Sequence, residues 1–129
     1  MSSASWKALL REVVGVDYLL DDAASLLAYE SDALTLFRCK PSAVVLPADA
    51  SEVAACVALL SSAKIPFAAR GAGTGLSGGA LVTAGGVVIA MTRLKRIHAI
   101  DVKKRFAIVD PGVVNLDLSR AAEQFGLRY

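Results

Sequence analysis

Apolar residues near the start of the chain recur at a helical spacing. Between Trp6 and Val14 they lie three or four residues apart, which predicts a helix with one buried face. Ser5 can cap this helix at its beginning, and Gly15 can end it. The pattern therefore predicts an amphipathic helix at residues 5–14.

A shorter helical pattern follows at residues 22–29, where Asp21 or Asp22 can serve as the N-cap. Residues 34–39 show neither a helical nor an alternating period, so they are expected to form an irregular link. We therefore expect residues 1–40 to form a helical arm that packs on the rest of the chain.

Two apolar runs, residues 44–46 and 65–69, are typical of short buried strands. Residues 51–63 between them show a helical period. A strand, a helix and a second strand form a βαβ unit, in which the two strands run parallel. The middle of the chain is therefore expected to contribute a parallel pair of strands to a sheet.

The helix of this unit has signals at both ends. Asp49 and Glu52 have the spacing of a capping box, and Lys64 lies at the C-terminal end, where a cation suits the helix dipole. Its buried face is expected to carry Val53, Cys56, Val57 and Leu60.

A third buried strand is predicted at residues 87–91, and two more at 97–102 and 106–110. The last two flank Lys103-Lys104-Arg105, which predicts a hairpin with a solvated basic tip. We expect an α+β fold in which a small mixed sheet, made of the βαβ unit and the hairpin, is covered by helices.

A final helix is predicted from residue 115, where Asn115 can act as the N-cap. Leu118, Ala122 and Phe125 would share its buried face, and Gly126 would end it.

The most unusual stretch is a run of ten residues with five glycines, directly after the strand at 65–69. Backbone N–H groups in such a loop can approach a ligand without a Cβ atom in the way. Several of them together form a concave nest for an anion, usually a phosphate, and hydroxyl groups can add donors. The candidate pyrophosphate-binding residues are Arg70, Gly71, Ala72, Gly73, Thr74, Gly75, Leu76, Ser77, Gly78 and Gly79.

Two common phosphate-binding motifs do not fit this run. A P-loop would need a lysine and then a serine or threonine after Gly78, where the chain has Gly79 and Ala80. The spacing of a dinucleotide-binding fingerprint is present from Gly73 to Gly78. However, no helical pattern follows it, and the next acidic residue is Asp101. A strand–loop–strand arrangement is therefore predicted.

The composition restricts the class of protein. Apolar residues make up 55% of the 129 residues and aromatic residues only 6%, which favours aliphatic strands buried on both faces. The formal net charge of +2 is too small to suggest nucleic-acid binding. No apolar run is long enough to form a transmembrane segment.

The potential metal ligands are few. Cys39 and Cys56 make neither a disulfide framework nor a zinc site, and His98 is the only histidine. Cys39 lies between two basic residues, which could lower its pKa, but a structural thiol is the simpler interpretation. We expect a reduced, cytoplasmic protein without a metal site. Partner proteins could hold it at the inner membrane.

The glycine run resembles the pyrophosphate loop of the vanillyl-alcohol oxidase family, whose members share a PCMH-type FAD-binding domain. The strand at residues 41–47 and the turn Asp110-Pro111-Gly112-Val113 also resemble family segments, in the same order along the chain. Tyr29-Glu30-Ser31-Asp32 and Met91-Thr92-Arg93-Leu94 are similar to the group of bacterial glycolate oxidase flavin subunits and D-lactate dehydrogenases.

The resemblance implies FAD as the cofactor, with Pro111 and Gly112 as further contacts. Many family members attach FAD through a histidine in this loop. The matching position here is Thr74, so non-covalent FAD is implied. Residues 41–129 would be the first subdomain of the FAD-binding domain, and the cap domain with the substrate and metal residues would lie beyond Tyr129. We therefore assign no catalytic and no metal-binding residue to this chain.

By resemblance, the full protein would oxidise a small 2-hydroxy acid, glycolate or D-lactate, to the 2-oxo acid. The chain would be its N-terminal part, inactive alone. Electrons would leave through an iron–sulfur or other electron-transfer subunit, and oligomerisation stays open. Two alternatives remain: a relative with other redox chemistry, such as aryl-alcohol oxidation or reduction of a cell-wall precursor, and a truncated module that binds partners but no flavin.

Overall fold

Four strands form the central sheet of the computed structural model, which describes residues 3–129. Three of them are parallel: β2 (Ala43–Val45), β4 (Val87–Ala90) and β3 (Phe67–Arg70). β1 (Leu19–Leu20) pairs with β2 in the antiparallel direction, so the order is β1-β2-β4-β3. The predicted mixed sheet is confirmed, and its antiparallel member is a two-residue strand without a strand pattern in the sequence.

The two central strands are buried on both faces. Every residue of β2 and β4 is buried. Because side chains alternate along a strand, Val87 and Ile89 pack in one core cluster, and Val88 packs in another. The expectation drawn from the aliphatic composition is therefore confirmed.

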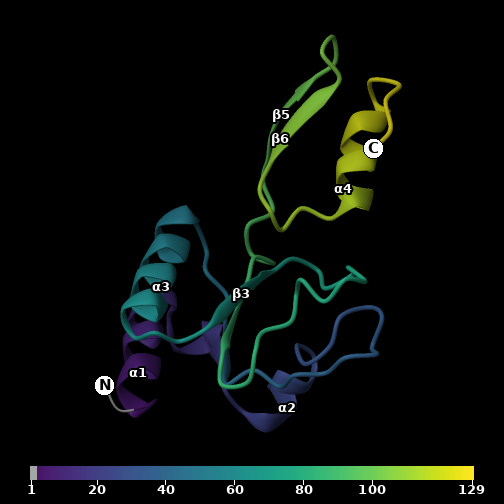
Figure 1. Cartoon of the computed structure of the whole chain (residues 1–129). Coiled ribbons are helices and arrows are strands. Elements are labelled where there is room, and N and C mark those ends of the chain that lie inside the picture. The colour runs from purple at the N-terminus through teal and green to yellow at the C-terminus, as the bar shows by residue number, and fades with distance from the viewer. Residues whose placement is uncertain (1–2) are drawn as a thin grey trace.

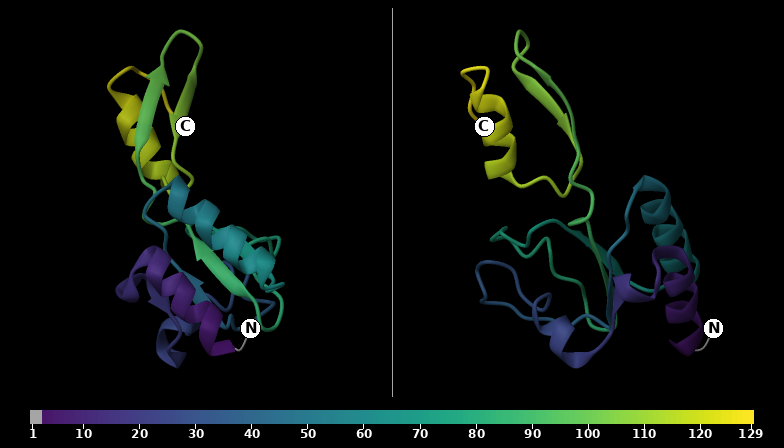
Figure 2. Two further views of the ribbon diagram at one scale, coloured as in Figure 1. Left: turned by 90° about the vertical axis from the view of Figure 1, so that its left-hand side faces the viewer. Right: turned by 180° about the vertical axis from the view of Figure 1, so that it is seen from behind.

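The helices α1 (Ser3–Val14) and α3 (Ala50–Ser62) cover one face of the sheet and pack against each other (Figure 2). Leu10 of α1 and Leu60 of α3 are fully buried there. The predicted N-terminal arm thus contributes directly to the core of the parallel strands. This cluster contains Trp6, Leu10, Val14, Leu19, Ala43, Val45, Cys56, Leu60, Val87 and Ile89.

The other face of the sheet is covered by the short helix α2 (Ala23–Leu27) and by the chain that follows the glycine run. Leu26 of α2 packs with Val44 and Val88, and Val82 joins the same cluster. The glycine run therefore lies between two anchored points, β3 on one side and Val82 on the other.

The first helix differs from its prediction at one end. It begins at Ser3, so Ser5 lies inside the helix and is not the N-cap. Gly15 ends it as predicted, with a φ of 90° that favours glycine, and its N–H donates to the carbonyl of Arg11. A short 3-10 helix, η1 (Val16–Tyr18), leads on to β1.

The two candidate caps of α2 have different roles. Asp22 is the N-cap and accepts hydrogen bonds from the N–H groups of residues 24 and 25. Asp21 instead binds Arg11 and Lys7 of α1 at 2.8 and 3.3 Å. The pair thus caps one helix and ties it to another.

Asp49 caps α3 as predicted, with hydrogen bonds from the N–H groups of Ser51 and Glu52. The Glu52 carboxylate accepts from the N–H of Ala48, one residue before the partner that a capping box would use. Cys56 and Leu60 are buried, whereas Val53 and Val57 are only partly buried.

β2, α3 and β3 form the predicted βαβ unit, and both strands are parallel to β4. The two strands are not neighbours, however, because β4 lies between them. β4, the last of the four strands in the sequence, therefore lies in the interior of the sheet.

The predicted hairpin is present as β5 (Ile97–Asp101) and β6 (Phe106–Val109). The sequence had suggested that the hairpin belongs to the central sheet. This prediction is wrong, because the hairpin forms a separate two-stranded sheet. Figure 1 shows it beside the last helix, α4 (Asn115–Glu123), away from the helices α1 and α3.

Two details of α4 correct the prediction. Val114 occupies the N-cap position and Asn115 is the first helical residue, so Asn115 provides no side-chain cap. Leu118 and Ala122 are buried as predicted, whereas Phe125 lies beyond the helix and is 46% exposed. Gly126 has a φ of 68°, in keeping with its predicted role near the helix end.

Candidate functional site

The glycine run connects the carboxyl end of β3 to β4 without forming a helix. β3 ends at Arg70, residues 71–86 form turns and bends, and β4 begins at Val87. The predicted strand–loop–strand arrangement is confirmed. In open α/β sheets, ligands bind outside the carboxyl ends of the parallel strands, and the loop leaves β3 at such an end.

Most backbone N–H groups of this loop have no acceptor within the protein. From residue 71 to residue 79, the part of the chain that the structure describes supplies an acceptor only for Gly78. Residues 74–77 are exposed. A row of free N–H groups on glycine-rich backbone is what an anion nest requires.

The small residues of the loop leave the approach to these N–H groups open. A Cβ atom on Gly75 would meet nothing within 4 Å, and the same holds for Gly79. The hydroxyl-bearing Thr74 and Ser77 are exposed, as are Ala72 and Leu76. The two hydroxyl groups can therefore reach a ligand on the solvent side of the loop.

Arg70 is the buried end of the predicted site, and only 8% of its surface is exposed. Its guanidinium donates to the carbonyl oxygens of Ser31 at 2.7 Å and Ala28 at 3.3 Å. It also lies 5.4 Å from the centre of the Tyr29 ring. The arginine thus joins the start of the loop to the turn at residues 28–32.

The Pro111–Gly112 turn lies beside the start of the loop. The carbonyl oxygen of Pro111 is 3.8 Å from the position of a Cβ atom on Gly71. The N–H of Gly112 donates to the carbonyl of Leu94, and a Cβ atom on Gly112 would collide with the carbonyl oxygens of Met91 and Leu94. Turn and loop therefore meet at the carboxyl ends of β3 and β4.

Comparison with known proteins identifies the family of this chain. The family model described as an FAD-binding domain matches residues 41–129. The chain belongs to this FAD-binding domain family.

Two relatives and one solved structure illustrate the similarity. The chain is 42% identical to glycolate oxidase subunit GlcD of Escherichia coli strain K12, over 95% of this chain and 24% of that protein. It is 37% identical to D-lactate dehydrogenase of Anaerostipes hadrus, over 78% of this chain and 22% of that protein. The crystal structure of p-cresol methylhydroxylase matches 96% of this chain and 25% of that chain with a TM-score of 0.82, and its identity of 23% shows the shared fold.

These matches establish a PCMH-type FAD-binding fold, as the sequence resemblance implied. The chain spans about a quarter of the length of the curated relatives it matches.

The residues of the loop fit the cofactor that gives the FAD-binding domain its name. A pyrophosphate needs several convergent donors and backbone that it can approach closely. The free N–H groups of residues 71–77, the hydroxyl groups of Thr74 and Ser77 and the open space at Gly75 provide both.

His98 of the hairpin forms a hydrogen bond with Asp110, which follows β6. Its Nε2 lies 2.7 Å from the Asp110 carboxylate, which also accepts from the N–H of Arg96. These hydrogen bonds, from His98 first and Arg96 second, hold the pKa of Asp110 below its usual value. Among residues 3–129 no group of three potential metal ligands comes together.

The two cysteines have different surroundings. Cys56 is buried in α3, and burial together with the charge of Glu52 raises the pKa of its thiol to about 11. Cys39 is partly exposed in the link before β2.

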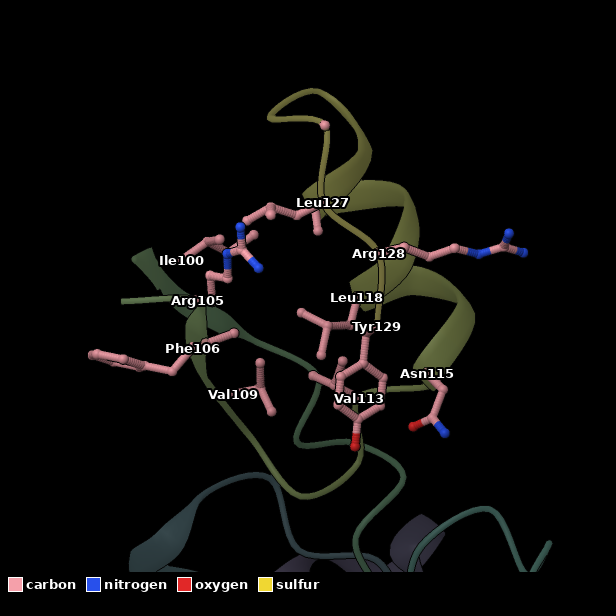
Figure 3. A pocket seen from close by; sticks show the side chains of 13 residues that line it. Ile100, Arg105, Phe106, Val109, Val113, Asn115, Leu118, Leu127, Arg128 and Tyr129 are labelled. Atoms are coloured by element: carbon pink, nitrogen blue, oxygen red, sulfur yellow. The ribbon is translucent and has the colours of Figure 1, made fainter. Parts of the chain in front are cut away.

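A groove of about 720 Å³ lies between the hairpin and α4 (Figure 3). Val109 of β6 and Leu118 of α4 lie on opposite sides of it, and Tyr129 extends into it beside Val113. None of the residues predicted to bind the cofactor lines this groove.

In residues 3–129, no helix has the length and apolar character needed to cross a bilayer.

Sequence reasoning missed the residue that contacts the loop most directly. Asp32 is 7% exposed, and its carboxylate accepts from the N–H of Gly78 at 2.9 Å and from that of Leu34 at 3.0 Å. The sequence contained one signal, since Asp32 ends the Tyr29–Asp32 segment that resembles the family. Its contact with a loop 46 residues away has no local pattern.

Proposed function

We propose that this chain is the FAD-binding part of a flavin-dependent oxidoreductase that oxidises a small 2-hydroxy acid, glycolate or D-lactate, to the 2-oxo acid. The observation that carries this proposal is the loop at residues 71–79, with its row of free N–H groups at the carboxyl end of β3. Membership of the FAD-binding domain family supports the cofactor. The names of the relatives support the substrate class.

In this proposal the loop holds the pyrophosphate. The N–H groups of residues 71–77 and 79 donate to its oxygens, and the hydroxyl groups of Thr74 and Ser77 add donors. Ala72 and Leu76 contribute through their backbone. The buried Arg70 holds the start of the loop, and Pro111 and Gly112 form the adjacent turn.

The bound FAD is non-covalent in this proposal, because Thr74 occupies the position at which many family members have a histidine. FAD, when bound, supplies the redox chemistry as the acceptor of the hydride. The described residues bind and orient the cofactor. We assign them no acid–base role, since His98 is already paired with Asp110.

We further propose that residues 41–129 are the first FAD-binding subdomain and residues 1–40 an arm that completes its core. The relatives are about four times as long as the region matched here, so the substrate groups belong to the remainder of such a protein. An electron-transfer subunit, such as an iron–sulfur protein, would take the electrons. A cytoplasmic site at the inner membrane would suit that partner.

The substrate class can be tested on a version of the protein that spans the length of its relatives. After loading with FAD, the protein is mixed without oxygen with glycolate, D-lactate or L-lactate. We expect glycolate or D-lactate to bleach the flavin band at ~450 nm and L-lactate to leave it unchanged. A flavin-loaded protein that none of these acids reduces, but that an aryl alcohol does, would contradict the proposed substrate class.

A further inference from the structure

The glycine loop is held from the protein side by the turn at residues 28–33. Four hydrogen bonds connect the two segments. Arg70 donates to the carbonyls of Ala28 and Ser31, and the N–H of Ala33 donates to the carbonyl of Gly75 at 3.2 Å. The fourth is the hydrogen bond from the N–H of Gly78 to the Asp32 carboxylate.

Both carboxylate oxygens of Asp32 are used in this contact. Oδ1 accepts from the N–H of Leu34 and Oδ2 from the N–H of Gly78. The first bond fixes the side chain on its own turn, as in an Asx-turn. The second bond then fixes one point of the glycine loop, at a residue with a φ of 77°. Because an asparagine has one acceptor oxygen in place of two, it cannot reproduce this pair of bonds with equal geometry.

The charge of Asp32 makes a direct role in phosphate binding unfavourable, since two anions close together repel each other. Its burial therefore needs another explanation. The carboxylate accepts from the N–H of Gly78, whereas the N–H groups of residues 71–77 have no acceptor among the residues that the structure describes. It thereby determines which part of the loop remains open to an anion.

We propose that Asp32 is a positioning residue for the cofactor loop. It holds Gly78 by hydrogen bonding, Arg70 holds the turn that carries Asp32, and the preceding N–H groups stay directed toward the pyrophosphate. This inference rests on the proposed function, because it gives the loop the same ligand. It adds a residue outside the glycine run to the cofactor site.

The test compares Asp32→Ala and Asp32→Asn with Leu60→Ala. Leu60 is fully buried in α3, on the face of the sheet that is opposite to Leu26 and Val82, so its truncation lowers stability without touching the loop. Hydrogen exchange of the Gly78 amide is followed by NMR in the 129-residue chain. The dissociation constant of FAD is measured by flavin fluorescence in the version with the length of the relatives.

We expect Asp32→Ala to speed exchange at Gly78 and to weaken FAD binding, each by about tenfold or more, because a hydrogen bond to a charged group is lost. Asp32→Asn should speed exchange at Gly78 as well, since its amide nitrogen cannot accept. Leu60→Ala should leave the local exchange at Gly78 and the FAD dissociation constant within about threefold of wild type.

Three results would overturn the inference. If Asp32→Ala binds FAD as tightly as the wild type does, Asp32 does not position the loop, although the proposed function would stand. If Leu60→Ala weakens FAD as much as Asp32→Ala does, the effect is one of general stability. A wild-type protein that fails to bind FAD would overturn the proposed function and this inference together.

Discussion

A Cβ atom on Gly73 would collide with the guanidinium group of Arg70. The Arg70 guanidinium passes beside Gly73 on its way to the carbonyls of Ala28 and Ser31. The absence of a Cβ atom at Gly73 leaves the space that the arginine side chain occupies. Gly73 also has a φ of 74°, which a residue with a side chain rarely adopts. The identity of residue 73 is therefore determined by the backbone and by Arg70 at once.

The first prediction concerns this pair. Gly73→Ala should lower the free energy of unfolding by about 2–4 kcal/mol, through the left-handed backbone and the collision with Arg70. Combining it with Arg70→Ala should remove the collision, so the double variant should lose at least ~1 kcal/mol less than the sum of the two single losses. Urea unfolding of the four proteins measures this coupling. Strict additivity would show that the two residues do not interact.

The second prediction contrasts two other glycines. Gly112→Ala should destabilise the protein by about 2–3 kcal/mol or more, because its Cβ atom would collide with the backbone carbonyls of Met91 and Leu94. Gly75→Ala should change stability by less than ~1 kcal/mol, since its Cβ atom meets nothing within 4 Å. Thermal unfolding of both variants provides the comparison. Equal losses would mean that the turn at Gly112 is not packed as described.

The third prediction concerns acid stability. Because hydrogen bonds from His98 and Arg96 lower the pKa of Asp110 in the folded state, the carboxylate stabilises the fold at pH values above the ordinary aspartate pKa of about 4. This stabilisation is lost as the pH falls through the lower, folded-state pKa. The difference in unfolding free energy between the wild type and Asp110→Asn should therefore shrink below pH ~4.

Urea unfolding at a series of pH values from neutral to acidic checks this result. Asp21, Asp22 and Asp49 also have lowered pKa values, so both proteins should still lose stability in acid. A difference between the two proteins that stays constant down to the lowest pH would argue against a role for the Asp110 charge.

The fourth prediction concerns the thiols. With a pKa of about 11, only on the order of one in a thousand Cys56 thiols is ionised at pH 8, and the side chain is buried. An alkylating reagent should therefore modify Cys39 and spare Cys56 in the native protein. Mass spectrometry of the labelled peptides identifies the site, and labelling in denaturant should modify both. Equal labelling of both thiols in the native protein would contradict the burial of Cys56.

Local patterns predicted most elements of this fold. The hairpin, the βαβ unit and the strand–loop–strand form of the glycine run all follow from period, turn residues and glycine content within short windows. These features depend on residues close together in the chain, so the sequence displays them directly.

What the sequence did not reveal depends on contacts between distant residues. The insertion of β4 between β2 and β3 is decided by how three apolar strands pack, and all three have similar patterns. The contact between Asp32 and Gly78 joins residues 46 positions apart. Asn115 is a residue type that favours the N-cap position, yet α4 begins one residue earlier, and Val114 occupies that position.

The measurement that tests the central claim most directly is the visible spectrum of the protein after addition of FAD and desalting. It is made on the version with the length of its relatives, for the wild type, Gly75→Val and Ala84→Val. Ala84 is exposed and lies outside the glycine run, so it serves as the matched control. We predict a retained flavin band at ~450 nm in the wild type and in Ala84→Val, and its loss in Gly75→Val. A colourless wild type, or a Gly75→Val protein that retains the flavin fully, would contradict the assignment of the loop at residues 71–79 to the pyrophosphate of FAD.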